Sequence, residues 1–301
     1  LMGFVKQDAE ASKIMPSTAK NVFHEKGQSI IAEKNCQGCH LIEDRGHAIK
    51  TALFDWMMDQ PEYEDLSRME AKADLVSFIP PNLIGEGQKV QPDWLYHFFR
   101  APEMVRPAVQ IRMPTYNFTE EEINILIKYF NYLEPKGENF EWVDVDSWQN
   151  NVFRDPHQIS LSNKEYAEAE KLVSKDGHNC GQCHWMGNKE PQNKLPKDQA
   201  PNWSLASQRL KPEWLAYWIA NAPGLMSGTK MPAYYEGYKD LMKDSEGYTN
   251  STAFPEILGG DDGAQVRALR DYVLNFSANQ VVQQLPDAET QAIKKYVLNT
   301  E

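Results

Sequence analysis

The chain has 301 residues, of which 41% are hydrophobic and 25% are charged, and its formal net charge is −12. These values indicate a globular protein of about two domains, and no apolar run reaches the length of about 18 residues that would predict a membrane span. The acidic surplus disfavours nucleic acid and anionic membrane surfaces as partners, and it favours proteins with basic docking patches.

The first predicted helix leads into the pentapeptide Cys-Gln-Gly-Cys-His at residues 36–40. Before this pentapeptide, apolar or small residues recur at i, i+4, i+7 and i+8, a spacing typical of an amphipathic helix, at Phe23, Gly27, Ile30 and Ile31. The helix therefore ends beside the first cysteine.

Residues 41–80 follow the pentapeptide, and their apolar residues have helical spacing. We predict two short helices in this segment, from Leu53, Trp56, Met57, Leu66, Met69 and Ala73. After it come Pro81 and then a Met-Pro pair that begins at Met113. An apolar pattern at i, i+3, i+7 and i+10 predicts a helix that closes this half, at Ile123, Leu126, Phe130 and Leu133.

A linker, residues 141–163, joins this half to a second one. Its Trp142, Trp148 and Phe153 make it too aromatic for a free tether. We therefore expect the linker to pack across both halves and to hold them at a fixed separation.

The second half repeats the patterns of the first. A predicted capping box of Ser162 and Glu165 opens a helix that leads into Cys-Gly-Gln-Cys-His at residues 180–184. A Met-Pro pair follows at Met231, and a closing helix is predicted by Val266, Leu269, Val273 and Phe276. A last helix is predicted from Pro286 to Leu298.

The two halves form an internal duplication. Five residues recur 120 positions later, in the pairs Pro81/Pro201, Asn82/Asn202, Pro92/Pro212, Trp94/Trp214 and Leu95/Leu215. The halves differ in their extra residues, which are 41–80 in the first half and 234–262 in the second, the latter a predicted long ordered loop. Such insertions either specify partner docking and packing between the halves or cover the edge of a bound group.

All four cysteines of the chain, Cys36, Cys39, Cys180 and Cys183, lie in the two pentapeptides. They could form two disulfides, one zinc site, two redox dithiols or two covalent haem attachments. A zinc ribbon needs its two Cys-x-x-Cys knuckles roughly 15–20 residues apart, whereas 140 residues separate Cys39 from Cys180. A thioredoxin-like dithiol needs a βαβ context, whereas helical patterns precede both pairs.

Haem attachment explains the histidine that follows each cysteine pair. Two thiols spaced by two residues reach the two vinyl groups of one haem, and the adjacent histidine ligates the iron. We therefore predict His40 and His184 as proximal ligands of two haem c groups. Structural or surface roles are predicted for the other histidines, which are His24, His47, His97, His157 and His178.

The order of helix, Cys-x-x-Cys-His, loop, helix, Met-Pro loop and closing helix resembles the class I cytochrome c family, in two tandem copies. The resemblance implies an all-α fold with two cytochrome c-like helical domains, residues 1–140 and 164–301, each enclosing one covalently bound haem c. It also implies that Met113 and Met231 are the distal iron ligands. A thioether is a soft, neutral ligand, so it raises the reduction potential of the iron.

Other residue roles follow from the same resemblance. In that family a proline carbonyl accepts a hydrogen bond from the proximal histidine, and Pro81 and Pro201 match its position. Arg112 and Lys230 could pair with haem propionates. Core packing is the favoured role of the two repeated tryptophans, with a hydrogen bond to a propionate as the alternative, at Trp94 and Trp214.

An iron ligated on both faces has no vacant position for a substrate, so the expected chemistry is outer-sphere electron transfer without catalysis. We predict a dihaem cytochrome c that relays single electrons in a respiratory chain between a redox protein donor and an acceptor. It would act as a carrier or as the cytochrome subunit of a membrane-associated complex. The resemblance implies a periplasmic or equivalent location. The alternatives are a dihaem cytochrome c peroxidase, which must open one distal position, and an oxidase of a small inorganic substrate.

Overall fold

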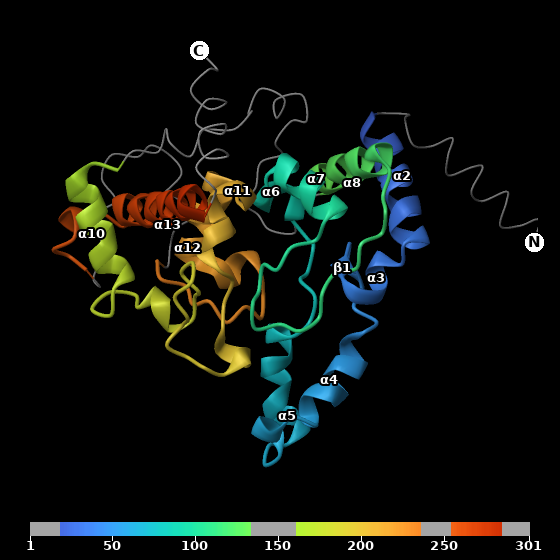
Figure 1. Ribbon diagram of the computed structural model, residues 1–301, viewed down its shortest axis with the longest axis horizontal. Helices are drawn as coiled ribbons and strands as arrows, with labels where there is room; N and C mark the ends of the chain where they lie inside the picture. Colours follow the sequence, from blue (N-terminus) through green and yellow to red (C-terminus); the bar gives the residue numbers. More distant parts are fainter. Residues whose placement is uncertain (1–18, 134–160, 236–253, 285–301) are drawn as a thin grey trace, which may run out of the picture.

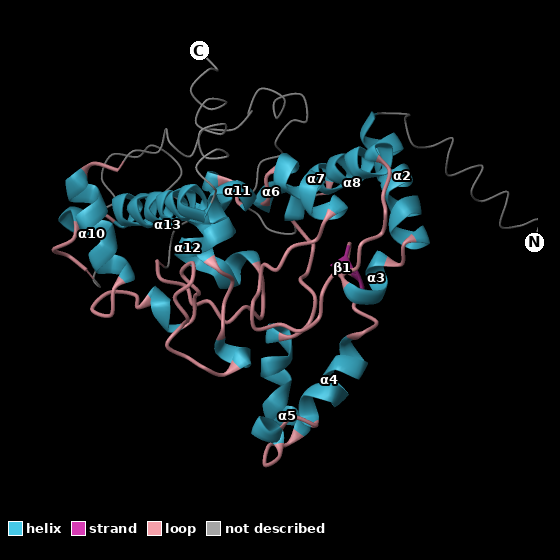
Figure 2. Cartoon of the chain, viewed as in Figure 1, coloured by secondary structure: helices cyan, strands magenta, loops and turns pink. Residues whose placement is uncertain are grey.

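Residues 19–133, 161–235 and 254–284 are described by the structure, which is a computed structural model of the chain. Helices dominate these residues, together with one antiparallel pair of short strands, β1 (Leu41–Ile42) and β2 (Arg45–Gly46). Figure 2 shows this helical content and the loops that connect it. The predicted all-α class agrees with it. Within the described ranges, no helix has the length and apolar character needed to cross a bilayer.

The first half is built from α2 (Ala19–Glu33), α3 (Cys36–Cys39), α6 (Glu86–Lys89), α7 (Pro92–Arg100) and α8 (Glu120–Tyr132). Helix α2 packs against α8, and α8 also contacts α6 and α7. The predicted apolar faces are confirmed, because Ile30 and Ile31 are buried in one cluster with Ile123 and Leu126. These contacts place the end of α2, and with it the first pentapeptide, beside the core of this half.

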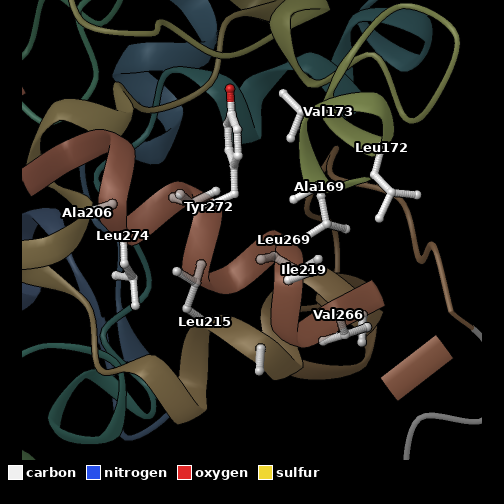
Figure 3. Close-up of a cluster of buried hydrophobic side chains, with 14 of the residues drawn as sticks. Ala169, Leu172, Val173, Ala206, Leu215, Ile219, Val266, Leu269, Tyr272 and Leu274 are labelled. Carbon is white, nitrogen blue, oxygen red and sulfur yellow. The ribbon is translucent and has the colours of Figure 1, made fainter. Parts of the chain in front are cut away.

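The second half is built from α10 (Asn163–Val173), η4 (Cys180–Gln182), η5 (Pro196–Asp198), η6 (Trp203–Leu205), α11 (Ala206–Arg209), α12 (Pro212–Leu225), η8 (Leu258–Gly260) and α13 (Asp262–Gln284). The predicted capping box is present, with the Ser162 hydroxyl accepting from the Glu165 amide at 3.3 Å. Helix α13 packs against α10 and α12. Figure 3 shows Leu172, Ile219 and Leu269 from these three helices meeting in one apolar cluster.

The extra residues of the first half form a small unit of their own, made of α4 (Lys50–Met58), η1 (Pro61–Tyr63), α5 (Arg68–Ala71) and η2 (Lys72–Ser77). In Figure 1 the α4 and α5 helices of this insert project below the rest of the molecule. Leu53, Met57 and Tyr63 are buried in its core. The prediction of two short helices is confirmed, but the prediction of Met69 and Ala73 on their apolar face is wrong, because both residues are exposed. Met69 is 84% exposed, because the face of α5 and η2 that packs against the core of the insert carries Ala71 and Leu75 instead.

The two halves are joined by hydrogen bonds with approximate two-fold symmetry. The Gln91 amide donates to the Arg209 carbonyl at 2.8 Å, and the Lys211 amide donates to the Lys89 carbonyl at 2.9 Å. Helix α7 contacts α11, and α6 contacts α12, so these helices lie together in the upper middle part of Figure 1. The Lys211 ammonium adds a hydrogen bond to the Gly87 carbonyl at 2.7 Å.

Several predictions fall on residues outside the described ranges. These are the linker as far as residue 160, most of the loop at 234–262, and the helix from Pro286 to Leu298. The proposed domain limits at residues 140 and 164 therefore stay predictions.

Candidate functional site

Each pentapeptide starts from the same backbone conformation. Asn35 and Asn179 both have φ of 52°, in the left-handed region that asparagine tolerates better than most residues. A single helical turn follows in each half, closed by the His40 amide donating to the Cys36 carbonyl at 2.9 Å and by the matching bond in the second half at 3.0 Å. Both halves thus present their two cysteines and histidine in one compact turn.

Each pentapeptide histidine is oriented by a proline carbonyl. His40 Nδ1 lies 2.8 Å from the Pro81 oxygen, and His184 Nδ1 lies 2.9 Å from the Pro201 oxygen. A carbonyl can only accept, so Nδ1 carries the proton in both rings. Burial lowers the pKa of both imidazoles, although the hydrogen bond to the carbonyl opposes this shift. Both rings are therefore neutral, with the Nε2 lone pair free to ligate a metal.

One cavity of about 850 Å³ joins the two halves. All the predicted ligand and attachment residues line it, together with both orienting prolines: Cys36, Cys39, His40, Pro81, Met113, Cys180, Cys183, His184, Pro201 and Met231. The pentapeptide histidines and the repeated methionines, which are 73 and 47 residues apart in sequence, therefore face the same space.

The thiols are unlike those of a redox dithiol. Burial raises the pKa of Cys36 to about 11 and that of Cys180 to about 12, whereas a reactive dithiol needs a lowered pKa. All four cysteines are free of disulfides. Among the described residues, no group of three or more His, Cys, Asp or Glu side chains could hold a metal ion by itself. The zinc and dithiol interpretations thus gain no support.

Buried cations from both halves also line the cavity. The Arg209 guanidinium lies 5.3 Å from the centre of the Trp94 ring, and Lys89 Nζ lies 5.6 Å from that of Trp214. Burial lowers the pKa of Arg209 and lowers that of Arg106 to about 10. Arg209 Nε is buried and has no hydrogen-bond partner among the described residues.

This combination fits haem. A buried N–H donor without an acceptor is costly unless a bound group satisfies it. Haem is a flat apolar ring with two carboxylates, so its ring suits the apolar lining and its carboxylates suit Arg209 and Arg106. The sequence analysis missed these cations. The internal repeat pairs Lys89 with Arg209, 120 positions apart, and this pairing could have identified them.

The structure gives the other candidate residues different partners. Trp94 and Trp214 are buried, and Trp94 Nε1 donates to Glu103 at 2.6 Å. Arg112 donates to the carbonyl of Ile111 at 3.2 Å, and Lys230 pairs with an aspartate of the insert. Packing thus accounts for the tryptophans.

Three of the remaining histidines are held by hydrogen bonds or ion pairs of the fold. His47 Nε2 lies 3.0 Å from the Pro80 carbonyl, and His178 Nε2 lies 3.0 Å from the Tyr235 hydroxyl. His24 pairs with Glu43. His97 is exposed, and His157 lies outside the described residues.

Residues 24–134 match the cytochrome c family model. Searches of curated proteins and of solved structures gave no significant match to the chain. The matched region contains the first pentapeptide, Pro81 and Met113. The chain thus contains a cytochrome c domain, which implies a covalently bound haem c with its iron and a general role in electron transfer.

Proposed function

We propose that the chain is a dihaem cytochrome c that relays single electrons, with one haem c in each half. The cavity supports this most directly, because the cysteines, histidines and methionines of both halves all line it. The repeated hydrogen bonds to Pro81 and Pro201 support the same role for His40 and His184.

The protein's contribution is to hold the ligands in place. Haem, when bound, supplies an iron that cycles between its ferric and ferrous states. His40 and His184 are held in one tautomer by the proline carbonyls, and Met113 and Met231 offer thioethers from the loops of each half. Because each half offers both a histidine and a methionine, a haem held by both side chains would have no vacant position for a substrate, which favours a relay over a catalytic centre.

The surroundings of this relay are part of the proposal. The net charge of −12 favours donor and acceptor proteins with basic docking patches. Covalent haem attachment of this kind suits the periplasm or an equivalent compartment. The protein would act there in a respiratory chain, as a carrier or as the cytochrome subunit of a membrane-associated complex.

A ferric absorption spectrum combined with a redox titration tests the proposal. We expect two haems per chain, Met–iron charge-transfer absorption from both, and two one-electron steps. One haem per chain, or Met–iron absorption from only one of two haems, would contradict it. Peroxide turnover far above background would instead favour the peroxidase.

A further inference from the structure

A carboxylate from the insert of the first half reaches into the second half. Asp74 Oδ1 accepts from Lys230 Nζ at 2.6 Å, and Asp74 Oδ2 accepts from Lys197 Nζ at 2.9 Å. The exposed fractions of the three side chains are 15%, 35% and 22% for Asp74, Lys230 and Lys197. These are therefore partly shielded, charge-assisted hydrogen bonds, which are stronger than exposed ion pairs.

The two lysines belong to the segments that provide the proposed second haem site. Lys230 directly precedes Met231, and Lys197 lies between His184 and Pro201. Lys230 Nζ also donates to the Lys197 carbonyl at 3.1 Å. Asp74 therefore ties the methionine segment to the segment beside the proximal histidine.

The insert is itself fixed on both sides. The Ser77 hydroxyl donates to the Lys197 carbonyl at 2.6 Å, and Arg106 donates to the Ile79 carbonyl at 2.7 Å. Ile111, two residues before Met113, packs against the core of the insert. Asp74 is thus held by a unit that touches the segments before both methionines.

Within the second half, the alternative carboxylate partner of Lys230 is Asp198, and this contact is weaker. Asp198 Oδ1 lies 3.6 Å from Lys230 Nζ, beyond hydrogen-bond distance. In the first half, Arg112 occupies the position equivalent to Lys230 and donates to the neighbouring Ile111 carbonyl. The carboxylate tie is therefore specific to the second methionine.

We propose that Asp74 is a positioning residue for the second haem, which holds the loop of Met231 closed through Lys230. The inference rests on the proposed function, because it takes Met231 as the iron ligand. In this proposal, the insert of the first half controls how firmly Met231 stays bound to the iron of the second half. Loss of the tie would let Met231 leave the iron more often and leave Met113 unaffected.

Cyanide binding to the ferric protein measures this opening, because cyanide can ligate the iron only where the methionine has left. We expect Asp74→Asn to raise the cyanide affinity of the second haem about tenfold, a change equal to one charge-assisted hydrogen bond. The second haem is identified as the site that Met231→Ala opens. Asp74→Glu should restore most of the original affinity.

Asp55→Asn is the matched control. It removes the charge of an aspartate of the same insert that pairs at 2.6 Å with Arg68, a residue of the insert itself. Its cyanide affinity at both haems should equal that of the unaltered protein. Equal affinities in Asp74→Asn and Asp55→Asn would overturn the proposal.

Amide hydrogen exchange tests the role of Asp74 independently of the assignment of Met231 as an iron ligand. We expect exchange over residues 226–235 to be about tenfold faster in Asp74→Asn than in Asp55→Asn, because the tie holds that segment. Absence of Met–iron absorption from the second haem of the unaltered protein would contradict the proposed function. Unchanged exchange would contradict the tie itself.

Discussion

At the scale of single residues, the pentapeptide histidines and the repeated methionines are fixed in different ways. Each histidine donates Nδ1–H to a carbonyl of its own half, at 2.8 Å for His40 and 2.9 Å for His184. The methionines lie on loops, and these loops depend on contacts with other segments. We therefore expect the methionine side of each site to be the easier one to open.

Replacement of either methionine should affect one haem only. In Met113→Ala or Met231→Ala we expect one iron to lose its thioether ligand and its potential to fall, by a fraction of the ~0.8 V range that axial ligands control. The other haem should keep its potential. Redox titration and the ferric spectrum measure both effects, and Met–iron absorption from two haems in either variant would show that the ligand is another residue.

At the scale of helices, the crossing of α2 and α8 brings the first pentapeptide to the cavity. Gly27 lies at this crossing, and a Cβ there would meet Tyr129 side-chain atoms at 2.5 Å. Tyr129 is itself buried, so it has little room to move. The close approach of the two helices therefore depends on the missing side chain.

Gly27→Ala should lower the free energy of unfolding by about 1–3 kcal/mol, the usual cost of overpacking a core. Ser29→Ala is the control, because Ser29 is on the exposed side of the same helix and its change should stay within about 0.5 kcal/mol. Denaturant titration measures both. Equal stability of the two variants would mean that α2 and α8 can move apart without a loss of stability, which would contradict the role of Gly27.

At the scale of the whole molecule, the symmetric contacts make the two halves one unit. Backbone hydrogen bonds join residues 89–91 to residues 209–211 in both directions. Lys211 crosses this interface to the Gly87 carbonyl, and burial lowers its pKa from 10.5 to about 8. The interface therefore contains an ammonium group that is costly to bury in its charged form.

This lysine predicts a pH dependence of stability. Between about pH 8 and 10.5 the unfolded chain binds the Lys211 proton and the folded chain has released it. The contribution of Lys211 to stability should therefore rise with pH across this window. In Lys211→Met the contribution is absent, so the difference in the free energy of unfolding between the unaltered protein and the variant should rise from pH 8 to pH 10.5. Denaturant titrations at several pH values measure it, and a constant difference would contradict the shift.

The amino-acid sequence by itself determined the local features of this protein. Helix faces such as Ile30 and Ile31, the capping box of Ser162, and the two pentapeptides depend on neighbours within a few turns of the chain. Duplication then related residues 120 positions apart, and it selected Met113 and Met231, which are 118 positions apart, from among the methionines. The prediction for Met69 was wrong because the spacing of apolar residues does not show which side of a helical stretch meets the core, and here that side carries Ala71 and Leu75.

Tertiary structure alone decided how the two halves share one cavity and which residues couple them. Asp74 meets Lys197 and Lys230 across 123 and 156 residues of sequence, and no periodic pattern relates partners at such separations. The repeat of basic residues at positions 89 and 209 could have pointed to Arg209, but only the structure showed that its Nε is buried and has no hydrogen-bond partner among the described residues. Such contacts depend on how the helices pack, and packing is a property of the folded chain as a whole.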